Sequence, residues 1–246
     1  MSDIAKLTGI VLSEHLIGEN DKSLTVLTKE RGKVQIMSQR SRRQNHKLFA
    51  ASQPFVYGEF VVTFTRNYIY LNSAECKDTF GDIKRELDDI CYATYFAEIA
   101  EYCTVEMQDE RNILNLLYVT FLAMRKKLMS YPLMKSVYEY KILQYTGIGL
   151  SVFGCLNCGK SDDLSMLSFE NGGVFCSECG KQIHGSQIKP SVLYTLQYLA
   201  SIPLNKLYSF RLKPELETEV RWIIHRFFKM HVGHQFKSEK MLEIIC

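Results

Sequence analysis

The sequence has 246 residues, of which 46% are hydrophobic and 23% charged, and this composition excludes a disordered or low-complexity chain. Its 30 Lys and Arg against 27 Asp and Glu leave a net charge of only +3, so any acidic partner must bind a local basic patch. No apolar run approaches the roughly 18 residues of a membrane helix. Residues 1–20 lack the continuous apolar stretch of a secretory signal, which predicts a cytoplasmic protein.

The first part of the chain predicts β structure. Turn signals separate five short apolar runs, which correspond to strands at 9–13, 23–28, 33–39, 55–64 and 68–71. In the fourth run Phe60, Val62 and Phe64 occupy alternate positions, as in a strand with one face on a core. Because so short a segment cannot hide both edges of a flat sheet, we predict a small closed or nearly closed barrel of the OB or SH3-like type.

From residue 79 onward the apolar period changes from two to about 3.6, which predicts helices. Thr79 and Asp82 form a candidate capping box for the first of them. Further helices are predicted from about 109 to Pro132, from about 135 to 146, from Pro190 to a point before Pro203, and from about 215 to 234. Their leucine and aromatic stripes predict core packing.

Four cysteines form two pairs with the spacing C-x2-C-x17-C-x2-C: Cys155, Cys158, Cys176 and Cys179. Each pair is followed by Gly-Lys, as expected where the residue after a metal knuckle adopts a left-handed conformation that glycine tolerates. Between the pairs, residues 171–173 (NGG) are a hairpin-turn signal. Two knuckles joined by a hairpin predict a four-cysteine zinc ribbon that holds one structural Zn²⁺ ion.

Two other interpretations of these cysteines fit less well. A catalytic zinc site keeps an open coordination position, whereas four cysteines close the shell. A redox CxxC pair does not require a second copy. The remaining cysteines, Cys76, Cys91, Cys103 and Cys246, have no spacing pattern, and Cys91 and Cys103 are interpreted as small core residues.

Residues 154–161 (GCLNCGKS) also match the phosphate-loop pattern GxxxxGKS. That loop works only between a buried strand and a helix whose N-terminus faces the phosphates. Here Gly172 follows before any helix has room to form, and two of the variable positions are already assigned as zinc ligands. We therefore predict that this segment binds no ATP.

Basic residues are concentrated between Lys29 and Lys47, where the sequence has seven of them and a single acid, Glu30. Most fall in the longest loop of the predicted barrel. Barrels of this type bind single strands through phosphate neutralisation and stacking on aromatic residues, so nucleic-acid binding is favoured over a merely solvated loop. The last predicted helix carries a second basic face, which an ordinary amphipathic helix explains equally well: Arg221, His225, Arg226 and Lys229.

Catalytic groups do not form a recognisable set. The six histidines show no pairing with a serine or cysteine, and no paired carboxylates stand out, so no enzyme activity is predicted. A zinc nuclease or other hydrolase would need acidic metal ligands that cannot be assembled from this sequence. The alternative interpretation is a zinc-ribbon regulator of transcription or an RNA-binding module, although no recognition-helix pattern supports it.

A barrel, helices, a four-cysteine module and further helices follow one another along the chain. In this order the sequence resembles the RecO family of bacterial recombination mediators over nearly its whole length. Residues 9–12 (GIVL) and 18–24 (GENDKSL) resemble its first barrel hairpin, 28–33 (TKERGK) its second turn, and the basic loop leading to 53–55 (QPF) its third. Residues 138–147 (YEYKILQYTG) resemble the helix before the first CxxC, and 232–238 (VGHQFKS) the terminal segment. The chain departs from the family at 147–149 (GIG), where proline is frequent, and at Lys189, where a polar cap is favoured.

Together with the predicted elements, the resemblance implies an α+β multidomain fold. A five-stranded OB barrel over 1–78 precedes an all-α domain over 79–150 and 186–246, which carries the zinc ribbon as an insertion at 151–185. The resemblance implies a non-enzymatic, nucleoid-associated protein that binds single- and double-stranded DNA without sequence specificity and anneals complementary strands. It also implies that the protein acts together with RecR and binds the tail of the single-strand-binding protein, so that RecA can be loaded. Carried onto this sequence, the DNA-binding positions are Arg31, Lys33, Arg40, Arg42, Arg43 and Lys47.

Overall fold

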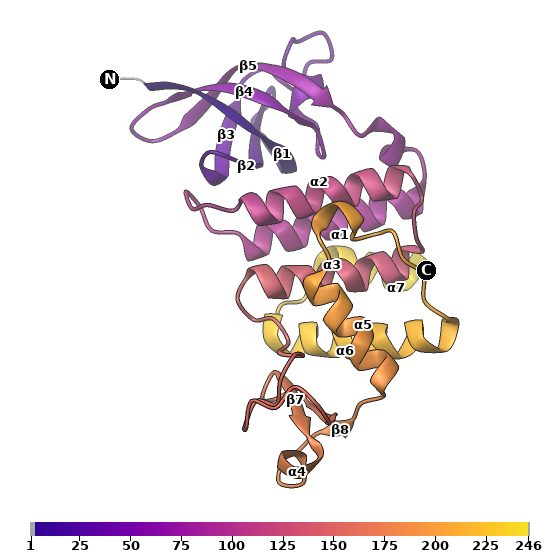
Figure 1. Cartoon of the computed structure of the whole chain (residues 1–246). Helices are drawn as coiled ribbons and strands as arrows, with labels where there is room; N and C mark the ends of the chain where they lie inside the picture. Colours follow the sequence, from indigo (N-terminus) through magenta and orange to yellow (C-terminus); the bar gives the residue numbers. More distant parts are fainter. Residues whose placement is uncertain (1–2, 246) are drawn as a thin grey trace. The chain divides into compact units, whose positions relative to one another are not determined.

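The chain, described over residues 3–245 in a computed structural model, folds into two compact units (Figure 1). Of the described residues, the first unit contains 3–126 together with 236–245, and the second contains 127–235. Strands come first and helices follow, so the α+β class predicted from the sequence is confirmed. The domain boundaries predicted at 78, 150 and 185 stay predictions. None of the described helices has the length and apolar character needed to cross a membrane.

Five strands of the first unit close into a barrel in the order β1-β2-β3-β5-β4: β1 (Asp3–Ile17), β2 (Asp21–Thr28), β3 (Gly32–Ser38), β4 (Tyr57–Phe64) and β5 (Ile69–Asp78). Neighbouring strands are antiparallel except β3 and β5, which pair in parallel at Ile36 with Ile69 and Met37 with Tyr70. Alternate side chains such as Val34, Ile36, Phe60 and Val62 fill the interior. Of the two barrel types that the sequence left open, this closed five-stranded arrangement is the OB type.

Two strands differ from the prediction for physical reasons. β1 is much longer than expected because its first half pairs with β4 and its second half with β2, and a register shift between Val11 and Ser13 lets it bend. β4 begins at Tyr57 rather than at Phe55, because Phe55 has a left-handed φ of 72° that a strand does not allow. The ring of Phe55 instead contacts Phe121 edge-on, with 5.4 Å between the centroids.

The helices of the first unit are α1 (Leu87–Cys103), α2 (Arg111–Arg125) and α7 (Lys237–Ile245), with short 3-10 turns η1 (Ala50–Ser52) and η2 (Gly81–Lys84). The predicted capping box at Thr79 and Asp82 is wrong, because Phe80 between them has a left-handed φ of 45° and α1 begins only at Leu87. The carboxylate of Asp78 instead accepts the backbone N–H of Phe80 at 2.9 Å and pairs with Arg125 at 2.6 Å.

Helix α7 was not predicted, because the group that caps it is distant in the sequence. The carboxylate of Glu98 on α1 accepts the backbone N–H groups of Lys237 at 3.0 Å and Ser238 at 2.9 Å. Next to this cap, the buried ring of Phe236 contacts Tyr95 of α1 edge-on, with 5.9 Å between the centroids. A carboxylate at a helix N-terminus stabilises it, so α1 fixes where α7 starts.

The second unit combines three long helices with a small sheet: α3 (Tyr131–Tyr145), α5 (Pro190–Ser201) and α6 (Pro214–Val232), and β6 (Leu164–Ser168), β7 (Gly173–Cys176) and β8 (Ser186–Gln187) in the order β7-β6-β8. A short helix α4 (Ser177–Gly180) and a 3-10 turn η3 (Leu204–Lys206) complete it. Helix α3 packs against α5 and α6. The predicted helix end at Pro132 is wrong: α2 ends at Arg125, and Pro132 lies in the first turn of α3, where its missing N–H is not needed.

Candidate metal centre and nucleic-acid interface

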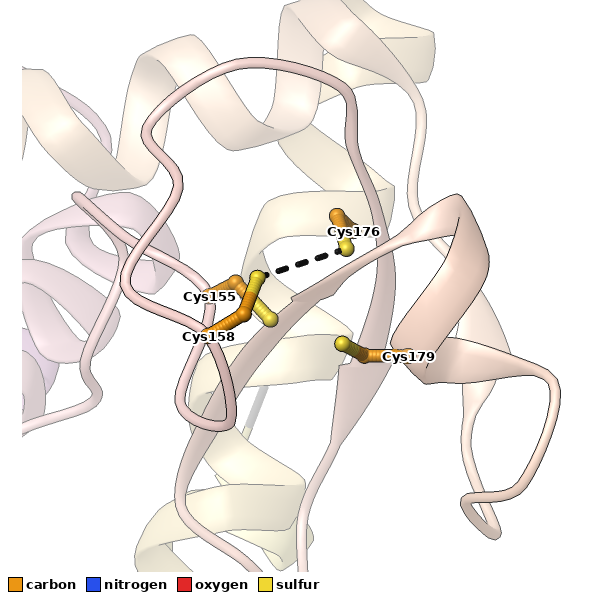
Figure 2. A group of neighbouring side chains, drawn as sticks. All are labelled: Cys155, Cys158, Cys176 and Cys179. Carbon is orange, nitrogen blue, oxygen red and sulfur yellow. Dashed lines mark hydrogen bonds between the residues drawn. The ribbon is translucent and has the colours of Figure 1, made fainter.

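The four paired cysteines converge in the second unit (Figure 2). Their sulfur atoms all lie within 4.8 Å of one another, and the Sγ atoms of Cys158 and Cys176 are 3.8 Å apart. Sulfur atoms bound to one tetrahedral zinc at about 2.3 Å are separated by about 3.8 Å, whereas a disulfide joins them at about 2.05 Å. The four thiols are free of disulfides. The cluster therefore fits, and can hold, one tetrahedral metal ion.

The first knuckle follows the expected geometry. Cys155 and Cys158 lie on the loop before β6, and Gly159 after them has the left-handed φ of 76° that the sequence predicts. The turn is closed by two backbone hydrogen bonds, from the N–H of Gly159 to the carbonyl of Cys155 at 2.9 Å and from the N–H of Cys155 to the carbonyl of Lys160 at 2.7 Å. Glycine is needed at 159 for its conformation.

The second knuckle is built differently, which corrects the prediction for Gly180. Cys176 ends β7 and Cys179 lies in the short helix α4, whose last residue is Gly180. The positive-φ glycines of the described chain do not include Gly180. Glycine is needed here for space instead, because an added Cβ would stand 2.4 Å from the side chain of Met166 on β6.

Backbone dipoles stabilise the thiolate of one cysteine of the cluster, Cys155. Burial raises the pKa of Cys155, but hydrogen bonds from the backbone N–H groups of Cys158, Cys176 and Asn157 outweigh it and lower the pKa to about 6. The side-chain amide of Asn157 donates to the sulfur of Cys179 at 3.3 Å. Since a thiolate rather than a thiol binds metal, Cys155 is prepared for metal binding, whereas the pKa values of Cys158 and Cys179 are raised by hydrogen bonds with the neighbouring cysteines. Among the described residues no histidine or carboxylate joins the four sulfurs, so the shell is closed.

The segment that matches the phosphate loop has no helix to support it. After Ser161 the chain enters β6 at Leu164, and the ammonium group of Lys160 lies 3.6 Å from the carboxylate of Glu178. A phosphate loop requires backbone N–H groups at a helix N-terminus. This geometry agrees with the prediction that the segment is a metal knuckle.

We expect ATP to bind neither the parent protein nor the Lys160→Ala variant, because the backbone N–H groups of this loop serve the cysteines. Equilibrium titration with a fluorescent ATP analogue measures this directly. A specific micromolar affinity that disappears in Lys160→Ala would show that the loop binds phosphate after all.

The predicted basic residues fall into two groups. Arg40, Arg42, Arg43 and Lys47 are all exposed on the loop of residues 39–49, called the basic loop below. The β1–β2 turn holds this loop: Arg42 donates to the carbonyl of Gly18 at 2.6 Å, and Arg43 donates to the side-chain oxygen of Asn20 at 3.0 Å. The loop that carries these four cations therefore lies beyond the C-terminal end of β3.

Arg31 and Lys33 lie at the opposite end of β3. Seven residues of strand separate the two ends by about 20 Å at ~3.3 Å per residue. The guanidinium of Arg31 is 5.8 Å from the ring centroid of Phe64, and the ammonium of Lys33 donates to the carbonyl of Glu101 at 2.6 Å. The structure thus does not bring all six predicted residues together.

A groove of about 650 Å³ crosses the outer face of β3 and is bordered by the β4–β5 turn. Its lining includes Lys33, Gln35 and Met37 from β3, Arg66 and Tyr68 from the turn, Tyr70 from β5 and one acid, Glu106. The rings of Tyr68 and Tyr70 meet edge-on with 6.1 Å between the centroids, and Tyr68 is 55% exposed. In OB barrels, this face and the adjoining loops are where oligonucleotides bind.

Comparison with known proteins identifies the family. Residues 1–80 match the family described as Recombination protein O N terminal, and residues 84–240 match Recombination protein O C terminal. The chain belongs to the RecO family. The DNA repair protein RecO of Caldicellulosiruptor saccharolyticus is 33% identical over 231 residues, or 92% of each chain. That of Clostridium acetobutylicum is 27% identical over 241 residues, or 98% of this chain and 97% of its own.

The family predicted from the sequence is thus confirmed, but the groove of this RecO-family chain was missed. From the sequence, residues 66–67 are predicted only as a turn between the strands at 55–64 and 68–71. The stretch 66–70 (RNYIY) does carry a signal, since a cation and two aromatic residues at alternate positions are typical of a surface that binds single strands. Only the parallel pairing of β3 with β5 places these residues beside Lys33.

Proposed function

We propose that this RecO-family chain is a DNA repair and recombination mediator that binds single- and double-stranded DNA without sequence specificity and anneals complementary strands. Family membership supports the repair role, and the relatives compared above are DNA repair proteins by name. The observation that carries DNA binding is the groove across β3, where an exposed tyrosine and cations share one surface. The proposal includes no catalytic step, since the chain acts by holding strands.

The groove offers both contacts that a single strand needs. A base can stack on the exposed ring of Tyr68, and Tyr70 lies beside it. Lys33 and Arg66 line the same groove and supply positive charge for phosphates. Because neither stacking nor phosphate contacts distinguish one base from another, this binding is independent of sequence.

The basic loop extends the positive surface of the barrel. Its four cations are exposed, and hydrogen bonds to the β1–β2 turn fix the side chains of Arg42 and Arg43. A patch that neutralises phosphates lowers the repulsion between two backbones, so that a complementary strand can approach a bound one. Base pairing then supplies the free energy of annealing.

The metal of the four-cysteine cluster is proposed to be one structural Zn²⁺ ion, held by Cys155, Cys158, Cys176 and Cys179. Four thiolates in tetrahedral arrangement are the ligand set that zinc prefers in structural sites. Such an ion would tie the loop before β6 to the end of β7 and to α4. It supplies cross-linking and no chemistry, because the closed shell leaves no position for water.

The partners follow from the family resemblance and belong to the same proposal. We expect the chain to act with RecR and with the tail of the single-strand-binding protein, so that RecA is loaded on the strand, in the cytoplasm at the nucleoid. Co-purification of the full chain with RecR, and separately with a peptide of that tail, measures these contacts.

Removing the tyrosines tests the groove. Replacing Tyr68 and Tyr70 by alanine is expected to weaken single-strand binding by about 1–3 kcal/mol for each stacked base. The salt dependence should stay as it is, because no charge is lost. Arg66→Glu should instead lower the slope of log affinity against log salt by about 0.7 for each phosphate contact removed. Fluorescence anisotropy with labelled oligothymidylate at several salt concentrations measures both effects.

A matched control is Tyr194→Ala, because Tyr194 on α5 is 70% exposed and lies in the second unit. It should bind as the parent does. If the groove variants keep the parent affinity and slope, DNA is not bound in this groove.

A further inference from the structure

Helix α6 of the second unit has an uneven charge distribution. Its acids, Glu215, Glu217 and Glu219, all fall in the first six residues, and from Val220 to Val232 the helix carries none. Glu217 lies 3.7 Å from Arg221, and Glu219 pairs with Lys189 at 2.6 Å. The acid-free part contains three cations and two histidines: Arg221, Arg226, Lys229, His225 and His231.

Trp222 lies in the middle of this acid-free part and is 53% exposed. Its ring meets Phe169, next to the β6–β7 turn, edge-on with 5.9 Å between the centroids. The guanidinium of Arg226 lies 5.1 Å from the Trp222 centroid and 4.6 Å from that of Phe169. The indole is thus held on one side while more than half of it stays open to solvent. Since burying a tryptophan is strongly favourable, an indole left this open suggests a binding surface.

Favourable interaction with the helix dipole explains only some of the cations in the acid-free part of α6. Cations in the last turn, such as Lys229, are stabilised by the C-terminal end of α6. Arg226 lies further from that end, and no carboxylate of the described residues comes within 4.0 Å of its guanidinium. Lys135 on the facing helix α3 differs, since its ammonium pairs with the buried carboxylate of Glu139 at 2.7 Å. Positive charge therefore remains uncompensated beside the indole at Arg226.

A groove of about 300 Å³ adjoins the indole and combines apolar surface with charged and hydroxyl side chains: Pro132, Lys135, Ser136, Thr218, Arg221, Trp222 and His225. A nucleotide needs a flat ring to stack on and cations for its phosphates, and Trp222 with Arg221 and Arg226 offers both. The exposed indole with its neighbouring cations therefore suits single-stranded nucleic acid, and an acidic peptide is the alternative that the test separates from it.

We propose that this face of α6 is a second contact for single-stranded nucleic acid, with a base stacked on Trp222 and phosphates at Arg221 and Arg226. It goes beyond the barrel groove and can fail while the groove proposal stands. One chain would then hold two strands, one on each unit, which is the arrangement that annealing requires.

The test uses the fact that Trp222 is the only tryptophan in the chain. A base that stacks on the indole changes its fluorescence, so we expect oligothymidylate to quench the emission of the full-length protein in a saturable, salt-sensitive way. The quenching should persist in the Tyr68→Ala, Tyr70→Ala variant of the barrel groove. In Arg221→Glu, Arg226→Glu it should require at least about ten-fold more DNA, whereas Lys206→Glu, Arg211→Glu, which changes exposed cations of the same unit, should match the parent.

A second measurement does not depend on tryptophan emission. Two oligothymidylates with different dyes should show energy transfer on one parent molecule. Trp222→Ala should weaken capture of the second strand about five-fold or more, and Trp222→Phe should restore most of it, because phenylalanine keeps a stacking ring. Unchanged emission while labelled DNA saturates the protein would overturn the proposal. So would equal loss of quenching in the barrel variant, or displacement of the strand by an acidic peptide that binds more tightly.

Discussion

Replacing Cys176 by serine is expected to abolish stoichiometric zinc binding and to unfold the ribbon while the barrel stays folded. A four-thiolate site contributes on the order of 10 kcal/mol to the folding of small zinc modules. The loop before β6 contacts β7 through the N–H of Leu156 and the carbonyl of Val174 at 3.0 Å, and the metal would add the cross-link between the two knuckles. Elemental analysis measures the metal, and hydrogen exchange compares the amides of β6 and β7 with those of β1–β5.

Cys76→Ser is the matched control, since Cys76 is an exposed free thiol on β5. It should keep one zinc per chain and the exchange pattern of the parent. Two results would contradict the structural role of the metal: a full zinc complement in Cys176→Ser, or barrel amides that lose protection together with those of the ribbon.

Local chemistry made parts of this fold predictable. The left-handed turn at Gly159 and the hairpin around Gly172 follow from glycines at fixed distances from the cysteines, and both have positive φ values. The same reasoning failed at Gly180, because what requires glycine there is the side chain of Met166 from another strand. A residue's own conformational preference is visible in a sequence, whereas the space left by a distant neighbour is not.

The strands and helices that the sequence did not predict, or predicted with other bounds, depend mostly on contacts between residues far apart in the chain. The first residues of β1 are polar or exposed at several positions, and they form a strand only because β4 pairs with them from Asp3 to Ile10. Strand β8 has two residues, too few for any periodicity. Helix α7 begins where Glu98, far away in the sequence, accepts its N–H groups.

The candidate DNA site also combines a local signal, which the sequence shows, with long-range pairing, which it does not show. Counting charges from residue 29 to residue 47 correctly finds a basic segment, but a strand runs through the middle of it and carries Arg31 and Arg40 to opposite ends. Tyr68 and Tyr70 join Lys33 only through the parallel pairing of β3 and β5. Sequence composition thus predicts the chemistry of the interface, and strand topology decides which residues share it.

Reversing the charge of Arg40, Arg42 and Arg43 to glutamate is expected to abolish annealing of complementary strands and to weaken DNA binding strongly. The change takes the net charge of the chain from +3 to −3, and it places the three negative charges within four residues of a single loop. Each lost phosphate contact should lower the salt slope of log affinity by about 0.7 for single strands. Annealing rates of dye-labelled complementary strands and salt titrations of binding measure the two effects.

Net charge alone must be separated from position, so the matched control reverses three exposed cations of the second unit, Lys206, Arg211 and Lys213. It carries the same net charge and should anneal at nearly the parent rate if the basic loop is the site.

A milder variant with glutamine at 40, 42 and 43 removes charge without adding repulsion, and its annealing rate should fall between those of the parent and the reversal. Zinc content and helical circular dichroism should match the parent in all three, because the loop is distant in sequence from the four paired cysteines and the three substituted side chains are exposed. If the loop reversal anneals as the parent does while Arg221→Glu, Arg226→Glu does not, the strands are annealed on α6 rather than on the barrel.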